Sequence, residues 1–250
     1  MGASSQHSDS APAGAADFRT THWSVVLAAT ERDSPAGSQA LAKLCSIYWY
    51  PLYAYVRRRG HDVHEAEDLT QQFFARLLQR SFLQSVSSEK GRFRSFLLAS
   101  LKNFLANEWD RTQTQKRGGG RAPIPLDLGN AEYRYQVEPI DTATPEVLYE
   151  RRWALTLMEQ VMTRLRQEYV RNEKADLFDE LKVFLSGEGK SMTYAELAAK
   201  HGVSESAVKM AVLRLRQRYG ELLRLEIAQT VSSPEEVEAE IRHLIAVVSQ

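Results

Sequence analysis

The sequence predicts an all-α protein composed of two helical domains, and three observations support that fold class. Apolar residues recur at intervals of three and four along most of the chain, which is the period of a helix. No stretch shows the sustained alternation of apolar and polar residues that is typical of a half-buried strand. Capping residues, prolines and glycines flank segments of helical length. No internal repeat indicates a solenoid.

The composition is that of a globular protein without an overall charge. Its 250 residues are 43% hydrophobic, which is enough to bury the core of one large domain or of two small ones. The formal net charge is +0, so any attraction to nucleic acid has to come from local segregation of charge. A single cysteine, Cys45, excludes an internal disulfide and agrees with a reducing compartment. We expect a cytoplasmic protein, since no apolar run has the length of a membrane span.

The first domain is expected over residues 18–112, after a disordered lead-in at residues 1–17 that is rich in Ser, Ala and Gly. Within it, Ser34 and Pro35 predict a helix start, because serine caps helices and proline is favoured in the first turn. The broad apolar side of this helix comprises Leu41, Leu44, Cys45, Tyr48, Trp49, Leu52 and Val56.

Two more helices are predicted in this domain, each with an apolar and a polar side. The first should begin after Asp62, which with Glu65 has the spacing of a capping box. Its buried side is expected to hold Ala66, Leu69, Phe73 and Leu77, and its outer side Asp68, Gln71 and Gln72. The second covers the segment FRSFLLASLKNFLANEWDR, with Phe93, Leu97, Leu101 and Phe104 inside and Arg94, Lys102, Asn103, Asn107 and Arg111 outside.

The second half of the chain is expected to be a separate helical domain followed by a tail. Residues 113–143 begin flexible and basic, continue acidic, and are interpreted as a linker. Thr144 then caps a long helix that opens the second domain, residues 144–223. The tail, residues 224–250, contains an amphipathic helix whose apolar side has to pack on another part of the chain.

The segment TYAELAAKHGVSESAVKMAVLRLRQRY predicts two short helices joined by a turn. Thr193 and Glu196 have the spacing of a capping box, Gly202 is free to adopt a positive φ, and Ser204 caps the second helix. That second helix carries an excess of basic residues outside its apolar stripe, which favours a helix-turn-helix that binds the major groove. A helical hairpin with a solvated basic face remains the alternative.

Other motifs do not support an enzyme. The loop GEGKS at 187–191 imitates a phosphate-binding loop, but the first glycine of that pattern is missing and a helix precedes it. His61, His64 and Asp68 are better explained as a capping turn than as a metal site. No catalytic set of Ser, His, Cys and Asp is evident, so we expect no covalent chemistry, no metal and no cofactor.

The order of these parts is specific even though each part is common. EAEDLTQQFFARLL, then FRSFLLASLKNFLANEWDR, then a linker and a terminal helix-turn-helix resembles the bacterial RNA polymerase sigma factors of the extracytoplasmic-function (ECF) group. The resemblance covers roughly Leu41 to Leu223. It implies core RNA polymerase and promoter DNA as partners, with an anti-sigma factor as a further candidate partner.

The resemblance also implies roles for particular residues. Polymerase binding is implied for Asp68, Gln71, Gln72 and Phe74. Binding of the promoter −10 element is implied for Lys102, Asn103, Asn107 and Arg111, and binding of the −35 element for Lys209, Met210, Leu213 and Arg214. The chain departs from relatives at Ala99 and Ser100, where housekeeping sigma factors carry a tryptophan pair, and at Met210 and Ala211, where many relatives have Ser and Arg.

The function expected from these observations is that of a sigma factor, which binds core RNA polymerase and directs promoter recognition and transcription initiation. A helix-turn-helix transcription regulator with an amino-terminal sensory or dimerisation module is the alternative. A nucleotide-binding enzyme that uses the loop 187–191 is a third and weaker hypothesis.

Overall fold

The computed structural model of the protein describes residues 34–79, 92–114, 129–137, 143–185, 192–231 and 233–249. Within these ranges every regular element is helical, which confirms the all-α prediction. The expected lead-in at 1–17 and the loop at 187–191 lie outside the described residues.

The helices of the amino-terminal half begin where the sequence predicts. Helix α2 spans Pro35–Arg58, and the Ser34 hydroxyl accepts a hydrogen bond from the Gly37 amide at 2.9 Å. Helix α3 spans Val63–Leu77, and the Asp62 carboxylate accepts one from the Glu65 amide at 2.9 Å. Helix α5 spans Phe93–Thr114. Each capping oxygen satisfies an amide that the first helical turn leaves unpaired.

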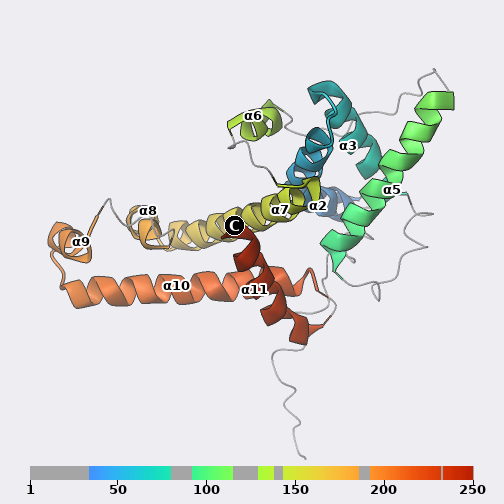
Figure 1. Ribbon diagram of the computed structural model, residues 1–250. Coiled ribbons are helices and arrows are strands. Elements are labelled where there is room, and N and C mark those ends of the chain that lie inside the picture. Colours follow the sequence, from blue (N-terminus) through green and yellow to red (C-terminus); the bar gives the residue numbers. More distant parts are fainter. Residues whose placement is uncertain are drawn as a thin grey trace, which may run out of the picture.

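The carboxyl-terminal half contains two long helices that run side by side (Figure 1). Helix α7 spans Pro145–Arg171 and is followed by α8, Ala175–Leu181, and by a 3-10 turn at Lys182–Phe184. Helix α10 spans Glu205–Ala228 and returns along α7. Ion pairs join the two helices: Arg164 binds Glu226 at 2.9 Å, and Arg218 binds Glu168 at 2.8 Å.

The turn between α9, Tyr194–His201, and α10 has the predicted local chemistry. The Thr193 amide donates to the Glu196 carboxylate at 2.6 Å, and the Glu196 amide donates back to the Thr193 hydroxyl at 3.2 Å. Gly202 adopts the left-handed conformation with φ 63°, and the Ser204 hydroxyl accepts from the Ala207 amide at 3.2 Å. This arrangement of two helices and a tight turn is consistent with a helix-turn-helix.

The turn that ends α7 also uses a left-handed residue, although that residue is not glycine. Glu173 has φ 58°. The amide of Glu173 donates to the Val170 carbonyl at 3.0 Å, and the Lys174 amide donates to the Tyr169 carbonyl at 2.9 Å. These two bonds form a Schellman motif, in which the left-handed residue is usually glycine because a side chain is strained there.

One helix forms where only a linker is predicted. Helix α6 spans Gly129–Val137 and packs on α2. Glu132 forms an ion pair with the Arg57 Nε atom at 3.0 Å and also accepts a hydrogen bond from the Tyr53 hydroxyl. The Arg134 guanidinium lies 4.2 Å from the centre of the Tyr50 ring. An acidic residue of the predicted linker is therefore held against α2.

The two halves of the chain share one buried core. Helix α7 packs along α2, and Tyr48 of α2 is buried in the same cluster as Tyr149, Trp153 and Leu157 of α7. The tail helix α11, Val237–Val248, follows a short 3-10 turn at Pro234–Glu236 and packs on both α7 and α10, as its apolar side predicts. The division into domains 18–112 and 144–223 stays a prediction, because no gap in this core marks the boundary.

The arrangement sets α9 and the start of α10 at the end of the molecule away from α3 and α5 (Figure 1). Helix α7 is the connection between these two ends. Among the described helices, none is both long enough and apolar enough to cross a lipid bilayer.

Candidate nucleic-acid interfaces

The first half of α10 presents the four residues predicted to bind the −35 element. Burial of Val208, Val212 and Leu215 turns the opposite side of the helix outward. All four predicted residues lie exposed on that outer side: Lys209, Met210, Leu213 and Arg214.

Lys209 is held in place by its own helix. Its Nζ atom lies 2.7 Å from a carboxylate oxygen of Glu205, one turn earlier, and 5.9 Å from the centre of the Tyr194 ring. The hydrogen bond to Glu205 raises the pKa of Lys209. A fixed cation beside two exposed apolar side chains suits DNA, because cations bind phosphates and apolar groups contact thymine methyls.

Arg214 differs from Lys209 in that it borders a cavity. The cavity has a volume of about 380 Å³ and lies between the end of α7, α8 and α10. Its lining combines cationic, amide, aromatic and aliphatic side chains: Tyr169, Asn172, Lys174, Leu177, Leu181, Ala211 and Arg214. Arg214 therefore stands close to the carboxyl end of α7.

Helix α5 buries the predicted apolar line and exposes most of the predicted −10 residues. Phe93, Leu97, Leu101 and Phe104 are all in the core. Asn103 and Asn107 are exposed, and Trp109, near the end of the described side chains, is 64% exposed. Only the backbone of Arg111 is described. Exposed aromatic rings can stack on unpaired bases, and exposed amides can hydrogen-bond to them.

Lys102, also on α5, is already paired within the protein. Its Nζ atom lies 2.6 Å from a carboxylate oxygen of Glu146, in the first turn of α7, and its side chain is 43% exposed. The hydrogen bond to Glu146 raises the pKa of Lys102, and the same bond lowers the pKa of Glu146. The sequence does not reveal this partner, because Glu146 lies 44 positions away in a different helix.

The prediction that Arg94 faces outward is wrong. Its side chain is 2% exposed and lies 4.7 Å from the centre of the Trp153 ring. It pairs with Glu150 of α7 at 2.5 Å and with Glu240 of α11. Helices α7 and α11, from the other half of the chain, cover this side of α5. The apolar periodicity of α5 does not predict that another helix packs on its polar side.

Helix α3 exposes two of the four residues predicted to bind polymerase and leaves a third half-buried. Asp68 and Gln72 are exposed, and Gln71 is half-buried. Phe74 is 0% exposed, and its ring centre lies 5.5 Å from that of Trp49 of α2. It therefore packs α3 onto α2 and is not part of the outer surface. Phe73 and Phe104 pack at 5.8 Å between ring centres, which joins α3 to α5.

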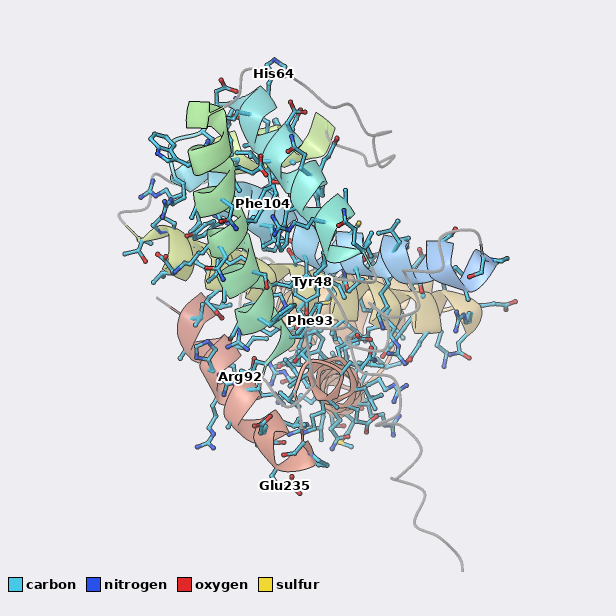
Figure 2. All side chains as sticks on the ribbon, turned by 90° about the vertical axis from the view of Figure 1, so that its right-hand side faces the viewer. Tyr48, His64, Arg92, Phe93, Phe104 and Glu235 are labelled. Carbon is cyan, nitrogen blue, oxygen red and sulfur yellow. The ribbon has the colours of Figure 1, made fainter. Side chains whose placement is uncertain are left out.

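The alternative sites gain no support from the described residues. His61 pairs with Glu65 at 3.0 Å, and His64 projects at the tip of the molecule, away from Phe104 and Tyr48 (Figure 2). In the described part of the chain, no group of three His, Cys, Asp or Glu side chains is placed to hold a metal ion.

Comparison with known proteins identifies one segment. Residues 50–115 match the family model described as Sigma-70 region 2. Neither the curated proteins nor the solved structures gave a match. The matched segment includes all of α3 and α5, with both of their outer surfaces, and ends before α9 and α10. Residues 50–115 are therefore similar to sigma-70 region 2, and this match supports a sigma factor.

Proposed function

We propose that this protein is a sigma factor of the ECF group, which binds core RNA polymerase and directs promoter recognition and transcription initiation. The observation that carries the proposal is the match of residues 50–115 to Sigma-70 region 2. The ECF assignment rests on the resemblance in the order of helices and linker.

Packing within the matched segment supports two separate binding surfaces. Helices α3 and α5 contact each other through Phe73 and Phe104, which leaves a polar side of each helix facing outward. The α3 side, with Asp68, Gln71 and Gln72, offers hydrogen-bond groups without a basic excess and suits a protein partner. The α5 side offers a cation and two amides and suits DNA. One segment can therefore bind polymerase and promoter together.

The proposed division of DNA contacts follows from these surfaces. On α5, Lys102 binds phosphate, Asn103 and Asn107 hydrogen-bond to the separated −10 strand, and Trp109 stacks on an unpaired base. On α10, Lys209 and Arg214 bind the −35 duplex, while Met210 and Leu213 make apolar contacts in the major groove. The protein performs no covalent chemistry in this role. It acts in the cytoplasm, and an anti-sigma factor is a further proposed partner.

Reconstituted run-off transcription with bacterial core RNA polymerase tests the proposal. We expect the protein to co-purify with core enzyme and to bind promoter DNA only in that complex, with an affinity that falls steeply with salt. A protein that instead bound a palindromic duplex alone, as a dimer, would be a transcription regulator.

The α3 surface allows a more specific test of polymerase binding. Asp68→Ala with Gln72→Ala should reduce the affinity for core polymerase and leave helix content and thermal stability unchanged, because both side chains are exposed. Glu67→Ala, which removes a half-buried carboxylate from the same helix, is the control. Unchanged polymerase affinity in the double variant would remove the role proposed for this surface.

A further inference from the structure

The cavity where α8 and the end of α7 meet α10 combines positive charge with an apolar wall. Lys174 and Arg214 supply two cations, and Tyr169 and Asn172 supply a hydroxyl and an amide. The rest of the wall is aliphatic: Leu177, Leu181 and Ala211. Among the described residues that line the cavity, none is acidic. Its volume of about 380 Å³ lies in the range of small-molecule sites.

The two cations of this cavity are available to a ligand. In the part of the chain that the structure describes, neither Lys174 nor Arg214 has an ion pair or a side-chain hydrogen bond. The other basic residues of α10 all have partners: Lys209 binds Glu205, Arg216 binds the Phe184 carbonyl, Arg218 binds Glu168, and Arg224 binds Glu238. Two like charges at one cavity repel each other, and an anion bound between them would relieve that repulsion.

The turn that ends α7 prepares the cavity for an anion. The Asn172 side-chain amide donates to the Glu168 carbonyl at 2.8 Å, and the Lys174 backbone amide donates to the Tyr169 carbonyl at 2.9 Å. These bonds satisfy helix-terminal carbonyls whose partial negative charge would otherwise repel an anion. The Asn172 nitrogen is used in this cap, so its side-chain oxygen is left to accept a hydrogen bond from a ligand.

Arg214 borders both the cavity and the proposed −35 surface. It lies three positions after Ala211, which lines the cavity, and four positions after Met210, which is exposed on the outer side of α10. Residues three and four apart are neighbours on a helix surface. One guanidinium therefore serves two surfaces, and a ligand that binds it in the cavity withdraws it from DNA.

We propose that this cavity binds a small organic anion, and that the bound anion competes with −35 DNA for Arg214. The anionic group binds Lys174 and Arg214, a hydroxyl of the ligand donates to Asn172, and the apolar body packs against Leu177 and Leu181. Occupation of the cavity lowers the affinity for the −35 element and leaves α3 and α5 unaffected. The competition rests on the proposed sigma function, whereas binding of the ligand to the free protein does not.

Titration of the full-length protein with 4-hydroxybenzoate tests the binding step, because this probe carries a carboxylate, a ring and a hydroxyl. Two-dimensional NMR should show saturable shifts of amides in residues 169–181 and 211–214. We expect a Kd of about 1 mM or lower, which is ordinary for a ligand of about ten non-hydrogen atoms. Phenol lacks the carboxylate and inorganic phosphate lacks the ring, so each should bind at least about tenfold more weakly.

Two variants and one control locate the site. Lys174→Gln removes an exposed cation and should weaken binding of 4-hydroxybenzoate about tenfold with helix content retained. Lys182→Gln is the matched control, because Lys182 pairs with Asp179 and lies outside the cavity lining. Ala211→Leu narrows the cavity, keeps both cations and should also weaken binding. No saturable binding at about 10 mM, or equal affinity in the wild-type protein and both cavity variants, would overturn the proposal.

Promoter binding by the complex with core polymerase tests the competition. Saturating 4-hydroxybenzoate should weaken binding to an intact −35 element about tenfold, the contribution of one base contact, and should not affect a promoter with a scrambled element. Unchanged promoter affinity would overturn the competition. A loss of promoter affinity in Lys174→Gln without ligand would assign the cavity cations to DNA and overturn the ligand site. Failure of the wild-type protein to bind core polymerase would overturn the proposed function, while ligand binding by the free protein would stand.

Discussion

The two proposed DNA surfaces use similar residues in different structural settings. On α10, Lys209 pairs with Glu205 of the same helix, and all four predicted residues are exposed. On α5, Lys102 pairs with Glu146 of α7, and Arg94, on the first turn, is enclosed by α7 and α11. The charged partner of Lys209 lies one turn away in the same helix, whereas the charged partners of Lys102 and Arg94 lie in helices that are distant in the sequence. A basic residue on an amphipathic helix is therefore not by itself evidence of an exposed cation.

The largest expected effect is on the free energy of unfolding, and it distinguishes a buried arginine of α5 from an exposed lysine of α10. Arg94→Ala should destabilise the fold by about 3–5 kcal/mol, because it leaves the carboxylates of Glu150 and Glu240 without their shared partner. Lys209→Ala, on the exposed surface, should change stability by less than about 0.5 kcal/mol. Urea denaturation followed by circular dichroism measures both. Similar losses in the two variants would contradict the distinction drawn between the surfaces.

The next effect concerns DNA recognition by α10. Lys209→Ala with Arg214→Ala should weaken binding of the −35 element by a few kcal/mol, since one good base contact contributes about 1–3 kcal/mol. Affinity for core polymerase should persist, because the first half of α10, which carries both residues, lies at the end of the molecule away from α3 (Figure 1). Binding of the polymerase complex to promoters with an intact or a scrambled −35 element gives the measurement. A parallel loss of polymerase binding would show that one of the two residues maintains the fold.

A smaller effect extends the comparison to α6, whose docking also depends on a distant partner. The hydrogen bond from Arg57 lowers the pKa of Glu132 from 4.5 to about 2. Because the folded value lies below the unfolded one, the stabilisation is complete above about pH 4.5 and is lost as pH falls towards 2. Hydrogen exchange of residues 129–137 should accelerate over that range. Glu132→Gln should abolish this pH dependence; protection that falls equally in the variant would assign it to another group.

The smallest expected effect lies in the connection between the two surfaces. Glu173→Gly should stabilise the protein by about 0.5–1 kcal/mol, because glycine adopts the left-handed conformation at the end of α7 without strain. Thermal unfolding measures the change, and Glu173→Ala is the control that retains the strain. A lower melting temperature for the glycine variant would indicate that the Glu173 side chain makes a stabilising contact.

Local features of this fold were predictable, and contacts between distant segments were not. The caps at Ser34, Asp62 and Ser204 and the left-handed Gly202 depend on bonds within about four residues, which the sequence order fixes. The apolar lines of α3, α5 and α10 follow from helical periodicity in the same way.

The errors and omissions share one physical cause. Glu240 lies 146 positions after Arg94, and Glu132 lies 75 positions after Arg57. The apolar periodicity of a helix does not show which of its polar residues a distant helix will cover. The burial of Phe74 behind α3 is a related case, because it depends on Trp49 of α2. Of the candidate site, the exposed residues of α10 and α5 were predicted, and the groups that restrain α5 were missed.

The docking of α6 on α2 shortens the connection between the two halves of the molecule. From residue 137, where α6 ends, to residue 145, where α7 begins, a fully extended chain reaches about 29 Å. Helix α7 adds a rise of about 40 Å from residue 146 to residue 172, at 1.5 Å per residue, so the two lengths come to about 70 Å. The −10 and −35 elements are about 25 base pairs apart, which is about 85 Å along B-DNA at 3.4 Å per base pair. If α7 left α2 while α6 stayed docked, the two proposed surfaces would therefore still be too close to reach both elements. The ion pair between Arg57 and Glu132 would have to break as well. The docking of α6 therefore limits the distance that the two surfaces can reach on a promoter.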